Sequence, residues 1–137
     1  MPAYDQCHPQ VVRALAREGW EVRHSPLFLD SGERTLFVDL ELVRKTQDQD
    51  ERIMVVEVKC FPASSAETTE LYISLGQYLV YRGLIAQNHI DADLYLAVPI
   101  HAYEGVFFDL ARSVVDELHV KLVVIDLDRE VVVQWHR

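Results

Sequence analysis

The chain lacks several features that define large protein classes. No apolar run approaches the roughly 18 residues that a membrane helix needs, and the first residues form no basic-then-apolar signal segment. We therefore expect no membrane partner. Two cysteines, Cys7 and Cys60, are too few for a dense disulfide framework, which favours a reducing cytoplasm as the compartment. We expect Cys60 to be a buried apolar residue rather than a nucleophile.

Basic residues are also scarce. Thirteen Lys and Arg stand against 22 Asp and Glu, which gives a formal net charge of −9. This balance argues against a protein that coats nucleic acid non-specifically, but it permits a local basic groove or a carboxylate cluster around a metal ion. With 137 residues, half of them apolar and no linker-like segment, the chain is predicted to form a single domain over residues 1–137.

Hydrophobic periodicity predicts the order α-β-β-β-α-β-α-β-β. The polar run 45–52 reads as a hairpin loop, and Ser64 with Glu67 forms a capping box for the central helix, which should end at Gly83. This order predicts an α/β fold with a mixed α+β sheet and helices on its faces. The expected elements are a helix at 8–18, strands at 20–24, 36–43 and 53–60, a helix at 64–83, a strand at 94–98, one or two helices at 103–118, and a hairpin of strands at 120–125 and 131–135.

Two charged residues interrupt the apolar strand 53–60. Glu57 and Lys59 are two positions apart, so both side chains should leave the same face of the sheet. Burying either alone would cost several kcal/mol, so they need a partner, solvent or a metal. Asp39 has similarly apolar neighbours in strand 36–43. If the two strands form an antiparallel hairpin, Asp39 and Glu57 become cross-strand neighbours.

Adjacent carboxylates repel each other unless a cation lies between them. Asp39, Glu57 and the backbone carbonyl of Val58 form a set of hard oxygen donors that suits Mg²⁺, with Mn²⁺ as a substitute. Lys59 would then orient the attacking water or neutralise charge. The alternative is a salt bridge from Asp39 or Glu57 to Lys59 at a solvated strand end. The spacing alone leaves both interpretations open.

The pattern resembles the PD-(D/E)XK motif of restriction-endonuclease-like nucleases, with Asp39 followed by Glu57-Val58-Lys59 on the next strand. Val38 stands where the motif's name has proline. The resemblance implies a core of a helix, three strands, a helix and a strand. Gln77 and Tyr81 resemble the Gln-x-x-x-Tyr element of RecB-type members, which implies that they support the active site from the following helix.

More closely, the whole chain resembles the XisH family, the fdxN element excision controlling factors of cyanobacteria. The resemblance implies a role in the programmed excision of a DNA element, with DNA, a site-specific recombinase and a small XisI-type protein as partners. It is carried by His8 with Gly19-Trp20, Phe37-Val38-Asp39-Leu40, Val56-Glu57-Val58-Lys59, Leu75-Gly76-Gln77-Tyr78-Leu79-Val80-Tyr81, Leu94-Tyr95-Leu96-Ala97-Val98-Pro99 and Val133-Gln134-Trp135.

Other residues are weaker candidates. Many PD-(D/E)XK members carry an acidic residue on the first helix, for which this chain offers only Glu18 or, with different chemistry, His8. The apolar helix 103–118 and the C-terminal hairpin with Trp135 are expected assembly surfaces for a homo-oligomer. Phosphate contacts would come from the scattered basic residues Arg34, Arg44, Lys45 and Arg82.

Three functions therefore remain open. The first is a Mg²⁺-dependent nuclease that uses Asp39, Glu57, Lys59, Gln77 and Tyr81. The second is a catalytically inactive nuclease-like fold that serves as a regulatory protein-binding or DNA-binding module. The third is a structural subunit with no role on DNA, which the net charge of −9 would suit.

Overall fold

A six-stranded mixed sheet forms the centre of the protein in a computed structural model that describes residues 6–48, 50–63 and 66–137. The strand order is β1-β4-β5-β6-β7-β8, and β2 and β3 form a separate two-stranded sheet. In chain order the elements are α1 (His8–Arg17), β1 (Glu21–His24), β2 (Leu27–Asp30), β3 (Thr35–Val38), β4 (Leu40–Lys45), β5 (Glu51–Val58), α2 (Glu67–Gln87), β6 (Asp93–Pro99), α3 (Ile100–Ala102), the π-helix η1 (Tyr103–Ala111), α4 (Arg112–Glu117), β7 (Leu122–Asp126) and β8 (Val131–His136).

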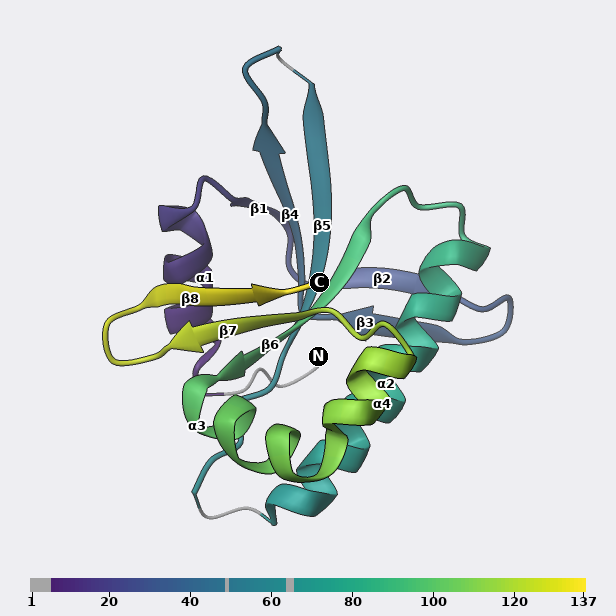
Figure 1. Cartoon of the computed structure of the whole chain (residues 1–137). Helices are drawn as coiled ribbons and strands as arrows, with labels where there is room; N and C mark the ends of the chain where they lie inside the picture. The colour runs from purple at the N-terminus through teal and green to yellow at the C-terminus, as the bar shows by residue number, and fades with distance from the viewer. Residues whose placement is uncertain (1–5, 49, 64–65) are drawn as a thin grey trace.

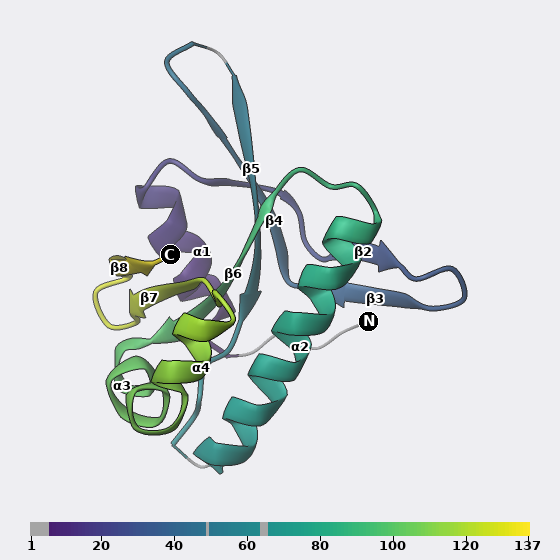
Figure 2. The same cartoon turned by 45° about the vertical axis from the view of Figure 1, so that its right-hand side comes forward.

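Helices cover both faces of the sheet, so the core has two layers. Helix α1 packs on one face, and α2 with the α3-η1-α4 segment covers the other (Figure 1; Figure 2). Side chains alternate between the layers along the buried strands: Leu94 and Leu96 face the α2 layer, whereas Tyr95 and Ala97 face the α1 layer. The near-continuous apolar runs of β5, β6 and β7 are therefore explained by burial on both faces.

Strand β5 lies in the middle of the sheet and joins its two halves. It pairs antiparallel with β4, where Leu40 is opposite Val56, and parallel with β6, where Glu57 is opposite Leu96. The antiparallel hairpin expected from the sequence is thus confirmed, and so is the terminal β7–β8 hairpin. Strand β5 ends at Val58, so Glu57 is its second-to-last residue and Lys59 directly follows the strand.

The expected single strand over 36–43 is wrong, because the chain breaks at Asp39. Val38 ends β3 and packs in the α2 layer, whereas Leu40 begins β4 and packs in the α1 layer. The physical reason is that the backbone N–H of Asp39 donates to the carboxylate of Glu57 instead of continuing a backbone ladder. Strand β3 pairs with β2, which the sequence pattern did not predict.

The central helix also differs from its prediction. It begins at Glu67 with Ala66 as N-cap and continues through Gly83 to Gln87, because a glycine inside a packed helix is tolerated. Ser64, the first residue of the expected capping box, lies outside the described residues. The third helical segment begins at Ile100 rather than 103 and runs as α3, η1 and α4. The first helix, predicted at 8–18, is found at His8–Arg17.

The two cysteines are joined by a disulfide, a pairing that the sequence pattern did not predict. Cys7 and Cys60 form a disulfide across 53 residues of sequence with a Cα–Cα distance of 5.8 Å. Cys60 is buried, as expected, but as half of a disulfide rather than as a simple apolar residue. Within the part of the chain that the structure describes, no helix is long and apolar enough to cross a membrane.

Candidate active site

Asp39 and the Glu57–Val58 end of β5 are linked by two reciprocal hydrogen bonds. The N–H of Asp39 donates to Oε1 of Glu57 at 3.2 Å, and the N–H of Val58 donates to Oδ2 of Asp39 at 2.8 Å. Each carboxylate therefore accepts from the backbone of the opposite segment. This exchange replaces the ladder bonds that would otherwise extend the β4–β5 pair, and it fixes both acids at one end of the hairpin.

Glu57 is held in an environment that disfavours its charge. The residue is 5% exposed and lies in a strand of buried apolar side chains. Burial, and then the negative charge of Asp39, raises the pKa of Glu57 to about 8, against the smaller opposing effect of Lys59. At neutral pH, and without a cation, this carboxyl group retains its proton. A cation between the two acids would displace that proton and remove the repulsion.

Lys59 lies just beyond β5 and completes the charged group. Its Nζ is 4.0 Å from Oε2 of Glu57, and its side chain is 14% exposed. At this distance the ammonium group makes no short hydrogen bond with Glu57, and the two form an ion pair only when Glu57 is ionised. The ammonium group is thus near the acids without being fully neutralised, while the Lys59 N–H is anchored on the carbonyl of Ala97.

Helix α2 faces this group with Tyr81. The side chain is 8% exposed, and burial together with the negative charges of Glu57 and Asp39 raises the pKa of Tyr81 to about 12. Gln77 is one turn earlier on the same helix. Its Oε1 atom is buried and has no hydrogen-bond partner among the described residues. A buried acceptor of this kind carries an energetic cost, which a bound water or ligand donor would remove.

The donor set fits a hard divalent cation with a partly open coordination shell. Asp39 and Glu57 supply carboxylate oxygens, and the backbone carbonyl of Val58, the residue after Glu57, is the further oxygen donor that the sequence predicted. Among the described residues, no group of three or more His, Cys, Asp and Glu side chains is arranged to hold a metal ion. Mg²⁺ commonly uses one or two protein carboxylates and fills its other positions with water and phosphate oxygens, so two carboxylates are compatible with it.

Several other predicted residues are used elsewhere. Glu18 lies at the far end of α1, where its carboxylate accepts a long 3.4 Å bond from the Trp135 indole, so it does not join the acids. Arg82 donates to the carbonyls of Leu118 and His119. Arg44 lies over the ring of Trp20, at 5.9 Å. His8 is the first residue of α1, directly after the disulfide-bonded Cys7.

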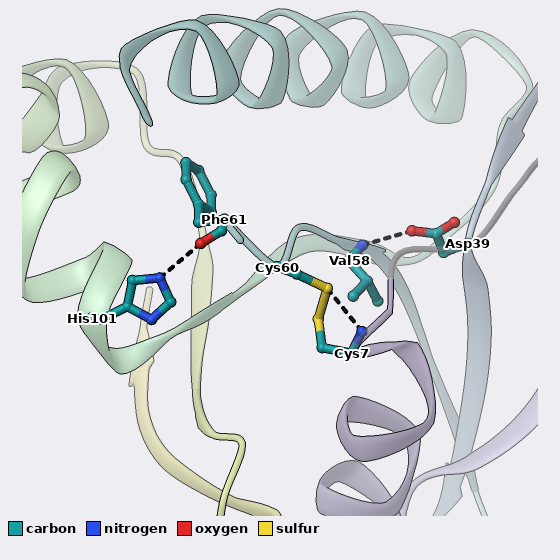
Figure 3. Close-up of a disulfide and its surroundings, with 6 residues drawn as sticks. All are labelled: Cys7, Asp39, Val58, Cys60, Phe61 and His101. Atoms are coloured by element: carbon teal, nitrogen blue, oxygen red, sulfur yellow. Dashed lines mark hydrogen bonds between the residues drawn. A yellow bond between two sulfur atoms is a disulfide. The ribbon is translucent and has the colours of Figure 1, made fainter. Parts of the chain in front are cut away.

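Two contacts next to the site were not predicted from the sequence. The hydroxyl of Ser25 donates to the carbonyl of Asp39 at 3.0 Å, and it comes from the connection between β1 and β2. The disulfide places Cys7 against Cys60, the residue after Lys59 (Figure 3). The sequence predicted that Cys60 is buried, but its bond to Cys7 depends on tertiary structure.

Comparisons with known proteins agree over almost the full length. The family model described as XisH protein matches residues 1–133. A crystal structure of an fdxN element excision controlling factor protein from Anabaena variabilis is similar with a TM-score of 0.83 and 32% identity, covering 97% of this chain and 100% of that one. An XisH family protein from Nostoc punctiforme PCC 73102 has a TM-score of 0.85 and 31% identity with the same coverage. No functionally curated protein matches the chain.

Proposed function

Because the chain belongs to the XisH family, we propose that it is an excision controlling factor in programmed DNA rearrangement and acts as a Mg²⁺-dependent nuclease of the PD-(D/E)XK type. The observation that carries the nuclease proposal is the reciprocal pairing of Asp39 and Glu57, with Lys59 beside them. The excision role follows from the similarity to the Anabaena variabilis protein.

The topology supports a restriction-endonuclease-like core. A helix, three antiparallel strands of the main sheet, a second helix and a parallel strand follow in the order α1, β1, β4, β5, α2, β6, with the β2–β3 hairpin between β1 and β4. This arrangement brings Asp39, which directly precedes β4, next to the Glu-x-Lys sequence at the end of β5. Tyr81 reaches the same end of β5 from α2, which agrees with the role proposed for the Gln-x-x-x-Tyr element.

The proposed reaction is hydrolysis of a phosphodiester. Asp39, Glu57 and the Val58 carbonyl would hold Mg²⁺, which supplies charge stabilisation and a more acidic bound water. Lys59 orients the attacking water and offsets the negative charge that develops on the phosphate. Gln77 accepts a hydrogen bond from a bound water through its unpaired amide oxygen. Tyr81 closes the site from α2 and limits the access of bulk water.

The proposed partners follow from the same family membership and from the charge. DNA, a site-specific recombinase and a small XisI-type protein would act with this chain. Since the net charge is −9, we propose that a homo-oligomer or the partner protein supplies the basic surface that DNA binding needs. The exposed apolar residues of η1 and α4, Phe108, Leu110 and Val114, provide one surface for such assembly.

One observation favours a second candidate. Glu57 and Lys59 are both largely buried, and the described residues contain only two acids at the site, so the group could persist as an ionic cluster in an inactive fold. In that case the protein is a regulatory module that binds protein or DNA. The two candidates differ in whether the chain cleaves DNA in a metal-dependent way.

Plasmid nicking tests the proposal. The protein should convert supercoiled plasmid to the open circle with Mg²⁺ or Mn²⁺, and it should do so neither in EDTA nor with Ca²⁺ alone. Glu57→Gln and Lys59→Ala should each reduce nicking by at least about 100-fold. Glu57→Gln should remain folded, because glutamine reproduces the shape of the protonated carboxyl group that the site holds at neutral pH.

Asp109→Asn provides a matched control. Asp109 is an exposed carboxylate on η1, so its replacement makes the same acid-to-amide change away from the site and should leave nicking intact. If wild-type protein nicks no plasmid with either metal and yet co-purifies with its partner, the regulatory module is the correct assignment. If Glu57→Gln nicks as fast as wild type, the cleavage comes from another site or from a contaminant.

A further inference from the structure

The disulfide Cys7–Cys60 connects the start of α1 to the residue directly after Lys59. Both cysteines are buried, and Cys60 Sγ also accepts a 3.0 Å hydrogen bond from the N–H of Cys7 (Figure 3). The bond joins segments that are 53 residues apart in sequence. A covalent link therefore lies one residue from the charged group of the candidate active site.

The segment that follows Glu57 is held at each of its next four residues. The N–H of Val58 donates to Asp39 and that of Lys59 to Ala97, at 2.8 and 3.0 Å. Cys60 is bonded to Cys7. The carbonyl of Phe61 contacts the imidazole Nε2 of His101 at 2.9 Å. Among these four anchors, the disulfide is the covalent one, and a chemical reaction can remove it without altering the others directly.

Phe61 makes the segment sensitive to the loss of an anchor. It has a positive φ of 49°, which is unfavourable for a bulky side chain and persists only where the surroundings enforce it. Its ring is buried against Phe107, with ring centroids 5.5 Å apart. The disulfide at Cys60 and the packing of the Phe61 ring thus maintain a backbone conformation that is unfavourable in a less constrained chain.

The disulfide borders a groove through which we expect a reductant to approach it. Cys7 and Cys60 line a groove of about 460 Å³ that opens to solvent and is also bordered by Gln10, Pro62 and His101. A disulfide that can be reached from solvent can react by thiol–disulfide exchange under native conditions, whereas a sealed one requires unfolding.

We propose that Cys7–Cys60 is a reversible thiol–disulfide site that controls the order of residues 58–61. A thiolate of a dithiol reductant attacks one cysteine sulfur and forms a mixed disulfide, and the second thiolate of the reductant then displaces the protein sulfur. Two electrons and two protons pass to the protein, which gains two thiols, and the reductant becomes a disulfide. The consequence for the carboxylate site rests on the proposed function; the change in chain order does not.

The oxidised protein is the ordered form. With the disulfide closed, Val58 and Lys59 are fixed between the Asp39 contact and the covalent link, so the lysine and the Val58 carbonyl remain in position. With the disulfide open, the segment loses its covalent anchor and keeps the hydrogen bonds of Val58, Lys59 and Phe61 and the packing of the Phe61 ring. Reduction should therefore loosen the strand end without unfolding the sheet, because β5 remains paired on both sides.

Hydrogen exchange on the metal-free protein tests this proposal. Oxidised protein is compared with protein treated with dithiothreitol in native buffer, and free thiols are counted in parallel. Two thiols should be released without denaturant. Amides 58–61 should then exchange about tenfold faster, whereas β7 (Leu122–Asp126) should exchange at its original rate. A double variant, Cys7→Ser with Cys60→Ser, should match the reduced wild type and ignore the reductant.

Two results would overturn the proposal. One is that no thiol appears until the protein is unfolded, which makes the disulfide a permanent staple. The other is that two thiols appear while amides 58–61 exchange as before. Since the wild-type arm needs no substitution, it decides the question even if the double variant does not fold. A parallel Mn²⁺ titration keeps the two proposals separate: if neither redox form binds Mn²⁺, the proposed function fails, and the exchange result still stands.

Discussion

Glu57 is the residue whose environment departs most from what its chemistry prefers. It is almost fully buried, next to another acid, and its pKa is raised to about 8 by burial and by Asp39. Natural proteins keep such costly groups where they perform a task, although structural ion pairs also perturb pKa values. In the proposed function the cost is offset when a cation binds between the acids.

The raised pKa predicts how stability depends on pH. Between about 4.5 and about 8 the folded protein retains the Glu57 proton while the unfolded chain releases it. The folded state then binds more protons, so this residue's contribution to the free energy of unfolding should fall as the pH rises through that range and level off above it. Glu57→Gln cannot titrate and should lack this component.

Urea unfolding of wild type and Glu57→Gln at pH 5, 6, 7, 8 and 9, without divalent metal, measures the effect. The stability of wild type relative to the variant should decrease steadily toward high pH. Asp109→Asn should follow the wild-type profile. Parallel profiles for wild type and Glu57→Gln would mean that Glu57 ionises normally in the folded protein.

At the scale of single elements, the sequence predicts those strands whose alternation is undisturbed. The pattern of 53–60 and the polar run before it identified β5 and its hairpin with β4, and this was enough to predict that Asp39 and Glu57 lie close together. Strand 36–43 was misjudged because its alternation continues through Asp39, although the backbone turns there. The cause is a side-chain-to-backbone bond from another strand, which no local pattern contains.

Helix α2 was located correctly, but its end was not. Gly83 resembles a terminator, yet the helix continues to Gln87 because its inner face, with Tyr78, Tyr81 and Ile85, packs into the core. Tertiary packing therefore outweighs the unfavourable helix propensity of a glycine. The same packing explains why the helix remains formed with no side-chain N-cap.

Gly76 and Gly83 lead to a prediction for this element. A Cβ atom built on either glycine meets no other atom within 4 Å, and neither has a positive φ. Gly76→Ala and Gly83→Ala should each stabilise the protein by about 0.5–1 kcal/mol, since alanine loses less backbone entropy in a helix. Denaturant unfolding at pH 7 measures both.

Gly19 is the contrasting control for that series. It has a φ of +89° after α1, a conformation that disfavours any side chain, and Gly19→Ala should lower the unfolding free energy by about 1 kcal/mol. If Gly76→Ala or Gly83→Ala destabilised the protein by a similar amount, the added methyl group would have to collide with another group or strain the backbone of α2.

For the molecule as a whole, composition and element order predicted a mixed α/β architecture but not its covalent link. The order of elements from α1 to β8 follows the sequence pattern apart from β2 and the break at Asp39. The Cys7–Cys60 bond was missed because two cysteines 53 residues apart show no pattern. Only the packing of α1 on the sheet brings Cys7 to the end of β5.

The net charge of the whole chain predicts weak binding to DNA. With −9 overall, and with Arg44 and Arg82 engaged in intramolecular contacts, few cations are available for phosphates. Glu57→Gln, which should bind without cleaving, should bind a labelled duplex at about 50 mM salt and lose it by about 200 mM. Fluorescence anisotropy measures this binding. No binding at low salt, with or without the partner protein, would favour a structural subunit that does not act on DNA.

The most direct test of the central claim is a crystal of the oxidised protein soaked in Mn²⁺ near pH 8.5, where Glu57 can ionise. Anomalous difference density should show one ion bound by a carboxylate oxygen of Asp39 and one of Glu57, at about 2.1 Å from each. Crystals of Glu57→Gln should show no ion there. Well-ordered Asp39 and Glu57 side chains with no anomalous peak between them in the wild type would contradict the account.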